Sequence, residues 1–156
     1  MSWEPFGSTR RLGDEAATPG APAEPAPPAD APAFRPLGRE PTRKLVVITC
    51  MDARIDPLGL LGLSLGDANV IRNAGAIVSD DVLRSLKASH SKLGTRRAVL
   101  LGHTDCAGHE SDAAAEAALV DGIRRIRGTS AVPDSFALEA LMFDVRTGEV
   151  RPVAPG

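Results

Sequence analysis

Two cysteines and a histidine stand directly after apolar segments, in a pattern that suits a metal ion. Cys50 follows the run Leu45 to Thr49, and His103 and Cys106 follow a second run, Ala98 to Leu101. If both runs are parallel strands, their carboxyl ends meet at one edge of a sheet, where the active sites of open α/β sheets lie. Two thiolates and one imidazole are enough to hold a zinc ion with three protein ligands.

A carboxylate and a guanidinium accompany the first cysteine. Asp52 and Arg54 alternate with Cys50, and side chains two residues apart in an extended segment project to the same side. Alone, such an acid and base form a solvated ion pair in most proteins. Cys50 and Cys106 also have simpler interpretations, as small buried apolar residues or as a disulfide, which a reducing compartment disfavours. The combination of all these residues at two strand ends favours the metal site.

Three short motifs carry these residues. They are Cys50-x-Asp52-x-Arg54, Arg72-Asn73-Ala74-Gly75 and His103-x-x-Cys106. In this order they resemble the β-class carbonic anhydrases, over about residues 43 to 106 well and over the remainder loosely. Either outer motif alone would mean little, whereas both at strand ends form a specific combination.

The resemblance implies a site, an activity and a partner. Cys50, His103 and Cys106 would bind a catalytic Zn²⁺, and Asp52 and Arg54 would form a dyad that positions a zinc-bound hydroxide. The implied reaction is the reversible hydration of carbon dioxide to bicarbonate and a proton. Related proteins of this fold act on carbonyl sulfide or carbon disulfide at the same kind of metal site, so a hydrolase of those substrates is one alternative. A catalytically inactive, zinc-stabilised interaction or regulatory domain is another.

Family members form dimers, so the resemblance also implies a homodimer. Here a Pro/Ala-rich arm replaces the helical structure with which members usually embrace the neighbouring subunit, and only Ala107 to Glu110 separate Cys106 from the next predicted helix. The apolar content of residues 44 to 153 is high and the predicted helices are few. We therefore expect part of one sheet face to be uncovered in a monomer and to contribute to a small dimer interface.

Length and charge restrict the class of protein. A chain of 156 residues has room for one core, and a net charge of −2 with a pI near 5.9 argues against a nucleic-acid partner. No apolar stretch approaches the length of a membrane span, so no membrane association is expected. Two cysteines do not make a disulfide-rich scaffold, and no N-terminal apolar region indicates secretion. We expect a cytoplasmic protein.

Composition divides the chain into two parts. Residues 1 to 42 hold nine of the thirteen prolines and little apolar bulk, which predicts a disordered Pro/Ala-rich arm. Residues 43 to 156 are predicted to form the zinc-binding, β-carbonic anhydrase-like domain. Within it, strands are expected at about 44–49, 69–72, 97–101, 140–145 and 149–153, and helices at about 57–64, 80–93 and 112–127.

This alternation predicts an α/β fold with a mostly parallel, four- to five-stranded sheet flanked by helices. If Cys50 and His103 share one metal, the first and third strands must be neighbours, which gives the order 2-1-3-4. The remaining candidates receive simpler interpretations. His90 and His109 are expected to be surface histidines, and Asp105 is expected to cap the turn that follows it.

Overall fold

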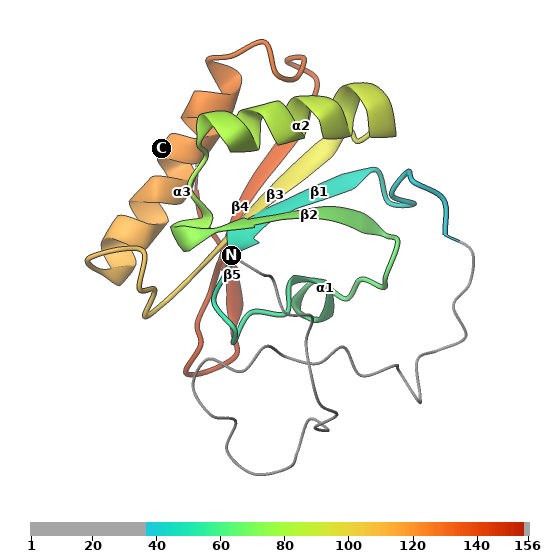
Figure 1. The fold of residues 1–156 in the computed structure, drawn as a ribbon. Helices are drawn as coiled ribbons and strands as arrows, with labels where there is room; N and C mark the ends of the chain where they lie inside the picture. Colours follow the sequence, from blue (N-terminus) through green and yellow to red (C-terminus); the bar gives the residue numbers. More distant parts are fainter. Residues whose placement is uncertain (1–36, 155–156) are drawn as a thin grey trace, which may run out of the picture. The chain divides into compact units, whose positions relative to one another are not determined.

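A five-stranded sheet with helices packed against it organises residues 37–154, the part of the chain that this computed structural model describes (Figure 1). In chain order the elements are β1 (Leu45–Cys50), α1 (Pro57–Leu60), β2 (Ala68–Asn73), the 3₁₀ turn η1 (Ala74–Ala76), α2 (Asp80–Leu93), β3 (Arg97–His103), α3 (Asp112–Arg127), β4 (Ala137–Phe143) and β5 (Val150–Pro152).

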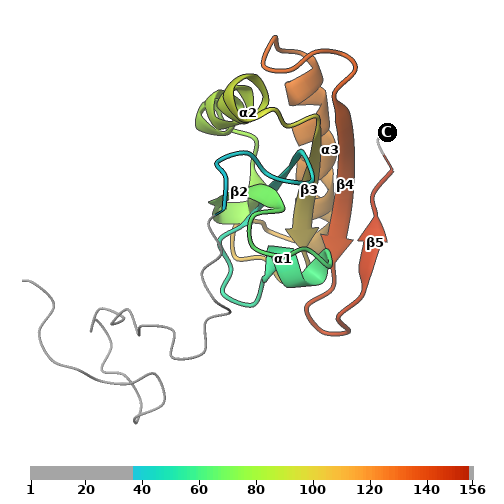
Figure 2. The same ribbon diagram turned by 90° about the vertical axis from the view of Figure 1, so that its right-hand side faces the viewer.

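The strands lie in the order β2-β1-β3-β4-β5. The first four are parallel, and β5 pairs antiparallel with β4 at the edge of the sheet (Figure 2). The predicted order 2-1-3-4 is confirmed, and the short last strand joins the same sheet. Every residue of β1 is buried, as is typical of a parallel strand covered on both faces. The carboxyl ends of β1 and β3 are therefore neighbours.

Helices α2 and α3 cover one face of this sheet (Figure 1). Each begins at a serine whose hydroxyl accepts a backbone hydrogen bond, from Val82 N–H to Ser79 and from Ala114 N–H to Ser111. The helix α2 ends at Gly94 in the left-handed conformation that a C-terminal cap favours. Buried side chains from both helices pack on alternate residues of the central strands, which fixes the start of α3 close to the end of β3.

The opposite face is covered by the segment around α1, with Ile55 buried and Leu60 packed against the strands. On this face Leu45, Val47 and Leu101 are almost completely buried. The loop after β1 folds back over these central strands and covers them, whereas Val70 on the edge strand β2 keeps 38% of its surface exposed, so the expected uncovered part of this face is confined to the sheet edge.

Two element boundaries differ by three residues or more from those predicted. The helix α1 ends at Leu60 instead of near residue 64, because Gly62 has φ +63° and leaves the helical region. The strand β4 begins at Ala137, opposite Arg97 of β3, instead of near residue 140. The first residue of β4 is determined by its pairing with β3, which the local sequence does not predict.

Most of the predicted arm, residues 1–36, lies outside the described residues, so its disorder stays a prediction. The last part of it is described and contacts the domain. Pro41 is buried, and the backbone N–H groups of Thr42 and Arg43 donate to the carbonyls of Gly66 and Asp67, both at 3.0 Å. None of the helices in residues 37–154 has the length and apolar character needed to cross a membrane.

Candidate metal centre

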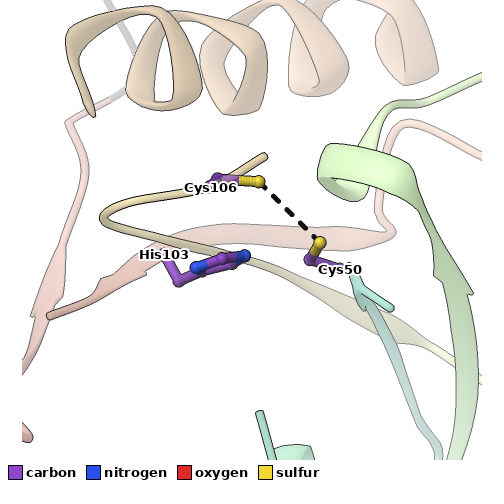
Figure 3. A group of neighbouring side chains, drawn as sticks. All are labelled: Cys50, His103 and Cys106. Atoms are coloured by element: carbon purple, nitrogen blue, oxygen red, sulfur yellow. Dashed lines mark hydrogen bonds between the residues drawn. The ribbon is translucent and has the colours of Figure 1, made fainter. Parts of the chain in front are cut away.

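Three potential metal ligands meet where β1 and β3 end. Cys50 is the last residue of β1, His103 is the last residue of β3, and Cys106 lies on the loop that follows. Their donor atoms all lie within 4.8 Å of one another, with the two sulfur atoms 3.8 Å apart (Figure 3). All three residues are buried. The structure thus brings together the three residues that the sequence predicted as metal ligands.

One nitrogen of the His103 ring is free to bind a metal. Nδ1 lies 2.8 Å from the carbonyl oxygen of Thr104, and because a carbonyl only accepts, Nδ1 carries the proton. Nε2 therefore presents a lone pair, and it is the buried side-chain nitrogen or oxygen for which residues 37–154 offer no hydrogen-bond partner. A buried polar atom without a partner is costly. A metal ion beside two thiols would satisfy it, so the residues present fit a zinc ion.

The two thiols differ in acidity. Burial raises the pKa of Cys50, but the nearby His103 ring, the backbone of Gly75 and Asp52, and the Cys106 thiol outweigh it and lower the pKa to about 7. The Gly75 N–H donates to the Cys50 sulfur at 3.3 Å. Burial raises the pKa of Cys106. Cys50 therefore forms the thiolate, the form that binds metals, more readily than Cys106.

Asp52 and Arg54 form a bidentate ion pair beside these ligands. Arg54 donates from Nε to Asp52 Oδ1 at 3.0 Å and from Nη2 to Oδ2 at 2.8 Å. These hydrogen bonds hold the pKa of the Asp52 carboxyl well below its usual range. Asp52 Oδ2 also lies 3.9 Å from His103 Nε2. An ionised acceptor therefore faces the space in front of the three ligands.

Asp105 also contacts Arg54, which the sequence alone does not predict. Its carboxylate accepts from Arg54 Nη1 at 2.8 Å, and its backbone carbonyl accepts from Nη2 at 2.9 Å. The sequence predicts that this side chain caps the turn that follows it, but the side chain pairs with the arginine of the first motif instead. Its place between His103 and Cys106 was the one sequence signal that linked it to the site.

The motif Arg72-Asn73-Ala74-Gly75, at the end of β2, holds the backbone and the sulfur of Cys50 through hydrogen bonds. Arg72 donates from Nε to the carbonyl of Cys50 at 2.9 Å and from Nη2 to that of Asp52 at 2.8 Å. The Asn73 side chain both donates to and accepts from the backbone of Ile77, which closes the η1 turn. Within that turn Gly75 has φ +82°, a conformation that glycine adopts without strain and that directs its N–H to the Cys50 sulfur.

The two histidines outside the ligand group are not free surface residues. Both are partly buried. His109 donates from Nε2 to the Gly75 carbonyl at 2.8 Å. His90 donates from Nδ1 to the Thr95 carbonyl at 2.7 Å and packs edge-on against Phe136. The expectation of ordinary surface histidines therefore holds only in part, because each ring is partly exposed but also binds a backbone carbonyl.

Comparison with known proteins gives a consistent set of relatives. A family model described as carbonic anhydrase matches residues 45–132. "Beta-carbonic anhydrase 1" of Mycobacterium tuberculosis (strain ATCC 25618 / H37Rv) is 36% identical over 143 residues, which cover 77% of this chain and 88% of that protein. A crystal structure of carbonic anhydrase from Streptococcus mutans has a TM-score of 0.67 and 33% identity, over 74% of this chain and 84% of that one. A "Carbon disulfide hydrolase" of Acidianus sp. (strain A1-3) is 44% identical over 64 residues, 41% of this chain and 31% of that protein.

Proposed function

The chain belongs to the β-carbonic anhydrase family, and from that membership we propose that it catalyses the reversible hydration of carbon dioxide with a zinc ion held by Cys50, His103 and Cys106. The observation that carries this proposal is the lone pair of His103 Nε2, which is buried without a partner among residues 37–154 and lies beside two sulfur atoms. When bound there, zinc would act as a Lewis acid that lowers the pKa of a water molecule, with the fourth coordination position open to it.

The residues around this group would orient the reactants. The Thr104 carbonyl holds the His103 ring in one tautomer, and the Gly75 N–H supports the charge on Cys50. Asp52 stays ionised because Arg54 binds both of its oxygens. A carboxylate at this place can accept a hydrogen bond from the water. That bond would direct the lone pair of the water oxygen toward the carbon of carbon dioxide.

Carbon disulfide or carbonyl sulfide is the second candidate substrate. The similarity to proteins named carbon disulfide hydrolase favours it, although that match spans 41% of this chain and 31% of the relative. Carbon disulfide and carbonyl sulfide, like carbon dioxide, are linear triatomic molecules with an electrophilic carbon. The same three ligands and the same carboxylate would therefore serve any of the three. The similarity over 77% of the chain to a β-carbonic anhydrase makes carbon dioxide the substrate that we propose.

A stopped-flow assay with a pH indicator tests this proposal on protein whose zinc content has been measured. We expect hydration well above the uncatalysed rate, loss of that activity with a strong chelator, and its return when zinc is added. Parallel incubation with carbon disulfide, with release of hydrogen sulfide as the readout, tests the second candidate. Zinc-loaded protein that hydrolyses carbon disulfide and leaves carbon dioxide untouched would replace our proposal with the alternative.

We further propose that the protein is a cytoplasmic homodimer. Support for a dimer comes from large apolar side chains that stay exposed near the edge strand β2, namely Met51, Val70 and Ile77, with 68%, 38% and 39% of their surface accessible. Support for the cytoplasm comes from the free thiols of Cys50 and Cys106, which a reducing compartment preserves.

A further inference from the structure

The guanidinium of Arg54 is bound from two sides. Asp52 takes hydrogen bonds from Nε and Nη2, and Asp105 takes one from Nη1 to its carboxylate and one from Nη2 to its carbonyl. A guanidinium is planar and its N–H groups point in fixed directions. Two acceptors on different edges therefore fix both its position and the tilt of its plane, whereas Asp52 alone would leave the pair free to swing together.

The backbone of Asp105 is held in an unusual conformation. Its φ is +53°, which is uncommon for a residue other than glycine. Its N–H donates at 2.7 Å to the Oδ1 atom of Asp112, the first residue of α3. The other oxygen of Asp112 accepts from Arg146 at 2.8 Å. The start of α3 thus holds Asp105 in the conformation that turns its carbonyl and carboxylate toward Arg54.

We propose that Asp105 is a positioning residue of this site, which holds Arg54, and through it the Asp52 carboxylate, beside His103 Nε2. Asp112 supports it by fixing its backbone. This inference rests on the proposed function, because it concerns the geometry of the carboxylate that would orient the water. The side chains of Arg54 and Asp105 are 46% and 69% exposed, so water weakens their ion pair. We accordingly expect a moderate loss of rate when Asp105 is changed, on the order of 3- to 10-fold in kcat/KM.

A double-mutant cycle separates positioning from a general effect on the fold. Asp105→Asn keeps a side chain that tolerates a positive φ and removes the charge. We expect it to lower kcat/KM in the parent protein and to cause no further loss in an Asp52→Asn background, with zinc content and melting temperature unchanged. Asp112→Ala should act in the same direction. Asp81→Asn is the matched control, because it removes a similarly exposed ion pair, that of Asp81 with Arg84 on α2. This variant should leave the rate unchanged.

A second readout uses metal-free protein and no activity. The Nε–H resonance of Arg54 in a ¹⁵N–¹H spectrum, assigned by its disappearance in Arg54→Lys, should be sharp in the parent and should broaden or shift in Asp105→Asn but not in Asp81→Asn. An unchanged resonance, or an equal loss of rate in both backgrounds of the cycle, would overturn the positioning role. Parent protein without hydration activity would overturn the proposed function instead, and the spectrum would still decide whether Asp105 holds Arg54.

Discussion

At the scale of single residues, one hydrogen bond decides which nitrogen of His103 can bind a metal. The Thr104 carbonyl requires the proton on Nδ1, so Nε2 faces the two sulfur atoms with its lone pair. The same arrangement of a ring nitrogen bonded to a carbonyl orients histidine ligands in many metal sites. The local backbone at the end of β3 therefore prepares this ligand before any ion arrives.

Replacing a ligand should remove the metal. We expect about one zinc per chain in the parent protein, because three ligands and one water complete a four-coordinate shell. Cys50→Ser and His103→Ala should each lose most of it, as measured by elemental analysis of protein purified without chelators. His90→Ala is the control, since its ring contacts Thr95 and Phe136 instead, and it should keep its zinc. Full retention of zinc in both ligand variants would contradict the assignment.

Asp52→Asn should retain zinc and lose catalytic rate. An amide can turn its NH₂ toward the water where the carboxylate only accepts, so the direction of the reacting lone pair is no longer fixed. We expect kcat/KM to fall by about 10- to 100-fold in stopped-flow assays. Asp121→Asn, which breaks an exposed pair with Arg124 on α3, should behave as the parent does. Equal activity of Asp52→Asn and the parent between pH 7 and 9 would exclude the role proposed for this residue.

At the scale of elements, the site depends on how closely two loops approach. The loop after Cys106 packs against the η1 turn, where Gly75 supplies its N–H to Cys50 and its carbonyl to His109. A Cβ atom added at Gly108 would lie 2.9 Å from the nitrogen of Gly75 and 3.0 Å from its Cα. Both are backbone atoms, so the two loops would have to separate.

Gly108→Ala should therefore destabilise the protein and weaken metal binding together. We expect a loss of about 1–3 kcal/mol in the free energy of unfolding, the usual cost of inserting an atom into a packed contact. Gly38→Ala is the matched control, because no atom lies within 4 Å of the Cβ it would add. Chemical denaturation and zinc titration measure both effects. A Gly108→Ala protein as stable as the control would show that the loops can separate without cost.

At the scale of the whole molecule, the described domain begins before the boundary that composition suggested. Pro41 is buried, and Thr42 contacts Asp67 through a side-chain hydrogen bond. Deleting residues 1–36 should leave zinc content and melting temperature unchanged, because their composition offers no core to join. Deleting residues 1–42 should lower the melting temperature, because it removes the contacts of Pro41 and Thr42. Equal melting temperatures for the two truncations, measured by calorimetry, would show that these contacts contribute nothing.

Association can be tested on the same intact protein. Light scattering should give twice the 16.3 kDa mass of one chain at micromolar concentration. Val70→Lys places a charge on the exposed side of the edge strand β2 and should shift the protein toward monomer. Lys87→Arg, on the opposite helix layer, preserves charge and should leave the mass unchanged. A monomer at high micromolar concentration with full specific activity would refute the dimer and any dependence of activity on it.

The sequence by itself determined the sheet order and the group of candidate ligands. Buried strands can be recognised in the sequence as apolar runs, and the first polar residues after each run indicate the strand end where a site forms. Requiring Cys50 and His103 to share one ion then places β1 beside β3, as the structure confirms.

The tertiary structure alone decided which polar groups meet around those ligands. Spacing gave no sign that Asp105 binds Arg54, that Arg72 holds the Cys50 carbonyl or that His109 holds Gly75. The chain has 18 basic and 20 acidic side chains, and almost any of them could pair by charge alone. Partners are chosen by which loops come within hydrogen-bond distance once the helices have packed on the sheet. The distance between two loops depends on the folded chain, and no periodic pattern in the sequence predicts it.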